Sequence, residues 1–217
     1  MGSDQSKRAL AKLASFTSSN PNNKQYIEKI NNFTSPLADT RMILRFFGLL
    51  STIDGLKHPY ETEKLYRQIE IAQGLSMMVY YPCEHVYWLG IHKILDLKDV
   101  DSWSRWSCQA WAIYIILDIF VIISKLSNTI KKMGSIKIKI KSAKKDEDFI
   151  KLKKYQEEIK VCENQKNDFY LRLIGYVGDL PLAIHWSLKN PILSPIGVGI
   201  LGTISSIAGI SMKWKYT

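Results

Sequence analysis

Cysteine is scarce in this sequence, and acidic charge is outnumbered. The 217 residues include three cysteines, an odd number without the dense spacing of a secreted disulfide framework. We therefore expect a reducing, cytosol-facing environment. Asp and Glu total 20 against 30 Lys and Arg, which leaves a formal net charge of +10. This excess predicts an anionic partner.

The sequence also lacks the patterns on which most enzymes and metalloproteins depend. It contains no nucleophile triad, no phosphate-cradling glycine loop and no cluster of metal ligands. Cys83, His85 and His92 come nearest to a ligand set, but their spacing matches no recognised metal site. We expect no enzyme activity, no catalytic residue, no metal and no cofactor.

A continuous apolar run is missing near the N-terminus. The first residues carry Lys7, Arg8 and Lys12 without an apolar core, so no cleavable secretory signal is expected. Residues 3–34 are predicted to form a basic helix and a loop. We expect them to belong to a single membrane domain that covers residues 1–217.

Aromatic rings and lysines occupy different parts of the chain. The rings concentrate in the apolar runs 77–88 and 103–120, and the lysines are densest between residues 131 and 166. Binding of nucleic acid would require bases to stack between clustered cations. Separated apolar runs and lysines instead suit hydrocarbon and anionic headgroups. A phospholipid membrane is the expected partner, and nucleic acid is not.

Residues 37–56 are predicted to form an amphipathic helix that follows a start signal at Ser35 and Pro36. At 100° per residue, one narrow face carries Arg41, Arg45, Gly48, Thr52 and Gly55. The wide apolar sector suits a helix inserted at a membrane interface. The residues we expect to bind the membrane are Arg41, Arg45, Phe46, Phe47, Leu49, Leu50 and Ile53.

The strongest single signal is the uncharged run at residues 192–212. As a helix it would be about 30 Å long, enough to cross the hydrocarbon layer. Gly202, Ser206 and Gly209 provide a small-residue face for packing against another helix, and predict self-association. Residues 111–125 are a weaker span, because Asp118 lies among nine large apolar residues.

Three ionisable residues fall in apolar segments. Asp118 lies in the weaker span, and Arg172 and Asp179 lie seven residues apart in the apolar segment 169–188. Such groups are costly at membrane depth unless they are paired. We therefore predict an ion pair between Arg172 and either Asp118 or Asp179.

A charged, Lys-rich insert, residues 134–166, is predicted to separate these apolar segments. It reads "SIKIKIKSAKK" and then "DEDFIKLKKYQEEIK", and we expect it to face water or lie on headgroups. Two spans would place this segment and the termini on opposite sides. Four membrane-embedded helices would place all charged stretches on the cytosolic side, the arrangement that the positive-inside tendency favours. The predicted fold is all-α, a membrane-embedded helical bundle with an amphipathic N-terminal helix and a C-terminal transmembrane helix.

Four blocks of the sequence resemble the peroxin-eleven family of peroxisomal membrane proteins, near its gamma-like branch. They are "ADTRMILRFFGLL", "YYPCEHVYWLG", "SRWSCQAW" and "GILGTISSIAGISMKW". The resemblance implies a multi-pass protein of the peroxisomal membrane that elongates peroxisomes before fission, self-associates and helps to bring in the dynamin-type fission machinery. A channel for small metabolites, lined by Asp118, Arg172 and Asp179, is the alternative function.

Overall fold

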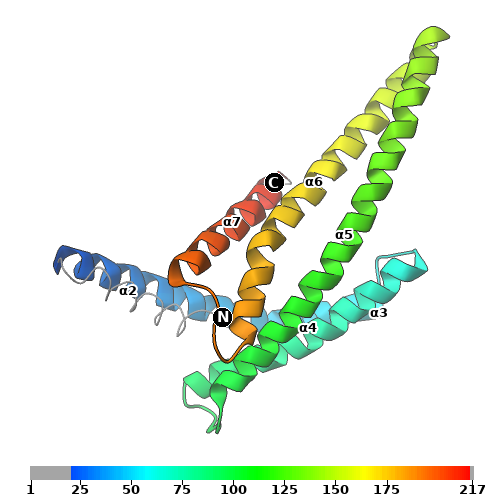
Figure 1. Cartoon of the computed structure of the whole chain (residues 1–217). Coiled ribbons are helices and arrows are strands. Elements are labelled where there is room, and N and C mark those ends of the chain that lie inside the picture. Colours follow the sequence, from blue (N-terminus) through cyan, green and yellow to red (C-terminus); the bar gives the residue numbers. More distant parts are fainter. Residues whose placement is uncertain (1–20, 216–217) are drawn as a thin grey trace. The chain divides into compact units, whose positions relative to one another are not determined.

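In a computed structural model that describes residues 21–215, every regular element is a helix. The elements are α2 (Pro21–Leu44), the 3₁₀ turn η1 (Arg45–Phe47), α3 (Gly48–Lys57), α4 (Lys64–Ile91), α5 (Val100–Lys145), α6 (Phe149–Ser187) and α7 (Pro195–Trp214) (Figure 1). The predicted all-α class is confirmed. Most of the predicted N-terminal basic helix, residues 3–20, lies outside the described residues.

The chain divides into two compact units. The first contains the chain up to Tyr114 together with Leu180–Leu201. Within it, α3 packs closely along α4 because glycines lie at the contact. A Cβ atom on Gly48 would come within 2.5 Å of the Tyr81 ring, and one on Gly74 within 2.6 Å of Leu56. The start of α5 joins this group, since the Ser76 hydroxyl donates to the Ala110 carbonyl at 2.6 Å.

The second unit contains Ile115–Asp179 and the chain from Gly202 onward. Its parts of α5 and α6 run antiparallel and are joined by the short turn 146–148 (Figure 1). Met133, Ile136 and Cys162 are buried between the two arms. The second half of α7 packs on α6, where the Ala208 Cβ lies 3.6 Å from the Cβ position of Gly175.

Prolines do not end helices where the sequence suggested. Pro36 lies inside α2, Pro82 inside α4 and Pro181 inside α6. The predicted helix start at residue 37 is therefore wrong, and residues 37–56 are divided among α2, η1 and α3. Proline costs a helix interior about 3 kcal/mol, a penalty that tertiary packing of long helices can offset.

The Lys-rich segment 134–166 is not a separate insert. Its first part completes α5 and its second part begins α6. Among residues 21–215, two helices, Val100–Lys145 and Pro195–Trp214, are long and apolar enough to cross a membrane. The weaker predicted span, 111–125, lies inside α5. The C-terminal span begins at Pro195 rather than at residue 192, in keeping with the preference for proline in the first turn of a helix.

Candidate membrane-contact surface

A row of large apolar side chains is exposed along α2, η1 and α3. Phe47 is 69% exposed and Leu50 is 64% exposed. Phe33 and Leu37 lie four residues apart, and Leu44, Phe47 and Leu50 follow one another at intervals of three, a spacing that places side chains on one side of a helical path. We call this row the exposed apolar row, and it consists of Phe33, Leu37, Ile43, Leu44, Phe47 and Leu50.

The other side of the segment is anchored to α4 through a charged side chain. The Arg45 guanidinium forms an ion pair with the carboxylate of Glu84, which is 1% exposed. Arg45 also donates to the Tyr80 hydroxyl at 2.7 Å, and that hydroxyl donates to Glu84 at 3.1 Å. One turn of η1 is thereby fixed to the middle of α4.

The arginine of this anchor is charged at neutral pH. Burial alone would lower the pKa of the Arg45 guanidinium, but the neighbouring Tyr80 and Glu84 raise it above its usual value. Arg45 therefore stays cationic.

The structure redistributes the residues of the predicted amphipathic helix. Arg41 is exposed. Arg45 and Gly48, which were expected on the same narrow face of the helix as Arg41, face α4 instead. Phe46 stacks on His85 with ring centroids 3.8 Å apart. Leu49 and Ile53 are half-buried.

Glu84 and Tyr80 were missed by the sequence reasoning, although a signal was present. Glu84 is the only Asp, Glu, Lys or Arg residue between Ile71 and His92. A lone carboxylate in so apolar a helix requires a cation from elsewhere in the chain. Arg45 was available in the preceding amphipathic segment.

The ionisable residues of the second unit pair with one another. The Arg172 guanidinium lies 2.8 Å from the Asp118 carboxylate, and the Tyr176 hydroxyl donates to the same oxygen at 2.5 Å. Asp179 instead accepts a hydrogen bond from Ser205 at 2.5 Å. Of the two predicted partners for Arg172, the structure therefore selects Asp118.

The small-residue face of α7 is only partly used within the chain. Ala208 is buried and Ser205 bonds to α6, whereas Ser206 is exposed. A Cβ atom placed on Gly202 or Gly209 would meet nothing within 4 Å. The predicted packing residues Gly202, Ser206 and Gly209 thus leave room for a second helix.

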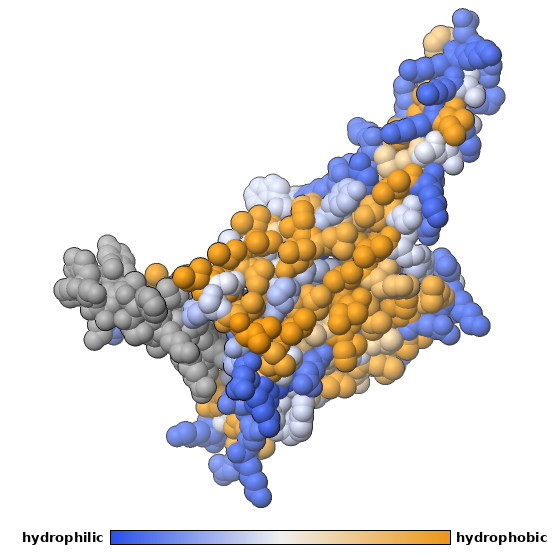
Figure 2. All heavy atoms as spheres, in the orientation of Figure 1, coloured by the Kyte–Doolittle hydropathy of each residue, from blue (hydrophilic) through white to orange (hydrophobic). Residues whose placement is uncertain are grey.

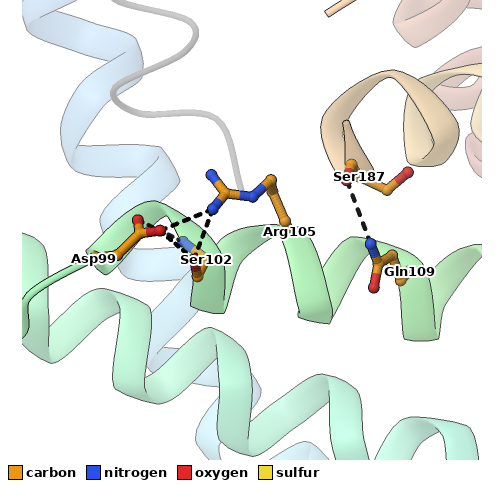
Figure 3. Close-up of polar contacts among 5 residues, drawn as sticks. All are labelled: Asp99, Ser102, Arg105, Gln109 and Ser187. Carbon is orange, nitrogen blue, oxygen red and sulfur yellow. Dashed lines mark hydrogen bonds and ion pairs between the residues drawn. The ribbon is translucent and has the colours of Figure 1, made fainter. Parts of the chain in front are cut away.

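Polar contacts fix the start of α5 (Figure 3). The Ser102 hydroxyl donates to Asp99, which also accepts hydrogen bonds from the Ser102 backbone at 3.1 Å and from Arg105 at 3.0 Å. These contacts, the Ser102 hydroxyl first, hold the Asp99 pKa below its usual range. Farther along, the Gln109 side chain donates to the Ser187 carbonyl at 3.5 Å. These contacts secure the tryptophan-rich lead into the apolar part of α5.

Comparison with known proteins gives a family for this helical chain. The family model described as Peroxisomal biogenesis factor 11 (PEX11) matches residues 2–214. The chain belongs to the PEX11 family. This assignment confirms the resemblance noted in the sequence, and it supports a general role in peroxisome proliferation.

Within the PEX11 family, two curated relatives of this chain belong to the gamma-like branch. Peroxisomal membrane protein 11C of Homo sapiens is 26% identical over 182 residues, covering 80% of this chain and 71% of the relative. The Mus musculus protein of the same name is 24% identical over 195 residues, covering 86% and 76%. No solved structure matches the chain.

PEX11 proteins are peroxisomal membrane biogenesis proteins and are not known enzymes. Within residues 21–215, no group of three or more His, Cys, Asp or Glu side chains is arranged to hold a metal ion. His85 stacks on Phe46, and the ring of His92 lies 4.3 Å from that of Trp88. His85 and His92 of this PEX11 chain thus take part in aromatic packing.

Proposed function

We propose that this PEX11 chain elongates and remodels the peroxisomal membrane ahead of fission by inserting its exposed apolar row beneath the headgroups of one leaflet. The single observation that carries this proposal is the two-sided α2–α3 segment. Phe47 and Leu50 are exposed on one side, and Arg45 is paired with buried Glu84 on the other. Inserted side chains expand one leaflet and favour curvature.

The anchor on α4 gives the inserted segment a mechanical function. Full burial of a side chain such as Phe47 or Leu50 is worth about 1.5–3 kcal/mol. Because η1 is fixed to α4, the inserted segment cannot drift away from the membrane-embedded helices. Exposed Arg41 would add attraction to anionic headgroups of about 1 kcal/mol.

We place four helices, α4 to α7, within the membrane. Each of these four helices crosses the membrane once, so the chain ends on the side where it began. The α2–α3 segment and the α5–α6 turn then both lie on the cytosolic side. This multi-pass arrangement agrees with the positive-inside tendency, since it keeps the lysines of residues 131–166 in the cytosol. Self-association through α7 and recruitment of dynamin-type fission machinery are further parts of the proposal.

The metabolite channel is the weaker alternative. Asp118, Arg172 and Asp179 were the residues expected to line a polar path. Arg172 and Asp118 neutralise each other at 2.8 Å, and Asp179 is bonded to Ser205. Paired charges of this kind serve helix packing better than ion passage.

Tubulation of anionic liposomes tests the remodelling function and separates the roles of the two arginines. Arg41→Glu should abolish tubulation both by a peptide of residues 37–56 and by the full chain, because each charge reversal changes lipid attraction by about 2 kcal/mol. Arg45→Glu should abolish it in the peptide, where Glu84 is absent and Arg45 is free to bind lipid.

In the full chain, Arg45→Glu should act by breaking the anchor to α4. Combining Arg45→Glu with Glu84→Arg should therefore restore tubulation by the full chain. The peptide that carries Arg45→Glu cannot be rescued in this way, because it lacks residue 84. Undiminished tubulation by Arg41→Glu would count against headgroup attraction. Failure of the exchange to rescue a correctly inserted chain would count against the anchor.

A further inference from the structure

The turn between α5 and α6 exposes large apolar side chains. Phe149 and Ile150, the first two residues of α6, are 76% and 85% exposed. Ile138, two turns before the end of α5, is also exposed. Neighbouring exposed apolar side chains of this size are typical of a contact site.

Lysines surround these apolar side chains. Residues 137–154 contain eight lysines, all exposed, and three acids. One of the acids, Asp148, accepts a hydrogen bond from the Lys151 backbone at 3.0 Å and pairs with the Lys151 ammonium at 2.9 Å. Figure 2 shows hydrophilic atoms gathered at this end of the hairpin. Net positive charge around exposed Phe and Ile is suited to an anionic bilayer.

The hairpin arms have a core that holds them together beyond the apolar part of α5. Met133, Ile136 and Cys162 are buried, and Tyr155 packs against them. The Lys139 ammonium lies 5.8 Å from the centre of the Tyr155 ring. The tip of the hairpin is therefore supported by its own packing.

The length of the hairpin decides which bilayer the tip can reach. Helix α5 continues without a break from its apolar part to Lys145. The twenty residues after Lys125 extend it by about 30 Å. Charges in physiological salt are screened over about 8 Å, so the lysines of the tip are too far from the headgroups around their own span to bind them.

We propose that the tip, residues 137–154, docks on the anionic surface of a second bilayer that faces the membrane spanned by α5. Phe149 and Ile150 insert between the headgroups of that bilayer, and the surrounding lysines bind its phosphates. The hairpin thereby holds two membranes about one hairpin length apart. This inference rests on α5 spanning a membrane, and it does not depend on insertion of the exposed apolar row.

Vesicle capture tests the inference with the full chain. The protein is reconstituted in phosphatidylcholine vesicles and mixed with labelled target vesicles that contain about 30% phosphatidylserine. Capture is measured by co-flotation. It should fall about tenfold or more for Phe149→Ser with Ile150→Ser, for Lys144→Gln with Lys145→Gln, and for neutral target vesicles.

Matched variants separate this inference from the proposed function. Val161→Ser removes an exposed apolar side chain from α6 away from the tip and should leave capture unchanged. Phe47→Ser with Leu50→Ser should also capture vesicles normally while losing tubulation. Equal loss of capture in Val161→Ser and in the tip variant would overturn the assignment to the tip.

A dye at Ser142→Cys identifies the bilayer that the tip contacts, since Ser142 is exposed and the three native cysteines are buried. Quenching by lipids of the target vesicles supports the inference. Quenching by lipids of the carrier vesicles alone overturns it and assigns the tip to its own membrane. Cleavage by trypsin shows that the tip is accessible outside the carrier vesicles. If a chain with an accessible tip captures no target vesicles, the inference is overturned and the tip is assigned to a protein partner.

Discussion

Each ionisable side chain in an apolar part of the sequence poses the question of its partner. From the sequence, two carboxylates were candidate partners for Arg172, those of Asp118 and Asp179, because few charged residues occur in the apolar segments. It could not choose between them, since Asp179 lies two turns away on the same face of α6, whereas Asp118 lies on α5. The choice depends on helix packing, which brings Asp118 to 2.8 Å and gives Asp179 a hydroxyl partner instead.

The pair of Arg172 with Asp118 should be energetically coupled. Arg172→Met leaves a buried carboxylate without its cation, so it should destabilise the protein more than Arg172→Met combined with Asp118→Leu. We expect a coupling energy of about 1–3 kcal/mol from a double-mutant cycle of unfolding in detergent micelles. Additive losses would show that the two side chains act independently.

The start of α6 should respond to acid through Asp148. Hydrogen bonds from the Lys151 backbone, followed by its ammonium, hold the Asp148 pKa below its usual range. The stabilisation is therefore present above the unfolded-state pKa and is lost as pH falls through the lower folded-state value. Hydrogen exchange at residues 149–152, measured between about pH 6 and pH 3, should accelerate on acidification in the wild type. Asp148→Asn should exchange with little dependence on pH beyond that of intrinsic exchange.

Helices were easier to predict from the sequence than their ends. The apolar character of α7 and the amphipathic character of the segment around Arg41 follow from local patterns, and both segments are helical. The helix ends predicted at Pro36 and Pro82 were wrong because the packing of long helices outweighed the local preference of proline for a helix end. The side of the segment that faces α4 could not be predicted, because it depends on Glu84, which lies 39 residues from Arg45 in the sequence.

Helix α7 should pack against a second copy through its small residues. Gly202→Leu with Ser206→Leu should weaken crosslinking between copies, because leucine fills space that a second helix would occupy. The position of Gly202 is open within the chain, so the substitution is compatible with the monomer fold. Ala208→Leu, which instead crowds Gly175 inside the chain, serves as the comparison for misfolding. Unchanged crosslinking in the first variant would argue against this interface.

At the scale of the whole molecule, our proposals assign three different functions to the apolar surface. In this account the spans hold the chain in the membrane, the exposed apolar row acts as a wedge in one leaflet, and the tip of the hairpin contacts a second bilayer. Membership of the PEX11 family supports a peroxisomal location. The exposure of the described apolar side chains supports the proposal that the three surfaces have separate functions. The three surfaces can be altered independently because their residues do not overlap.

Peroxisome shape in cells tests the wedge most directly. The triple variant Leu44→Ser, Phe47→Ser and Leu50→Ser removes apolar side chains that are already exposed, so the chain should remain folded and resistant to carbonate extraction. Its matched control is Ile138→Ser with Phe149→Ser and Ile150→Ser, which removes a similar apolar surface from the hairpin. The account predicts that the first variant inserts but no longer elongates peroxisomes, while the control elongates them normally. Normal elongation by the first variant, at wild-type abundance, would contradict the account.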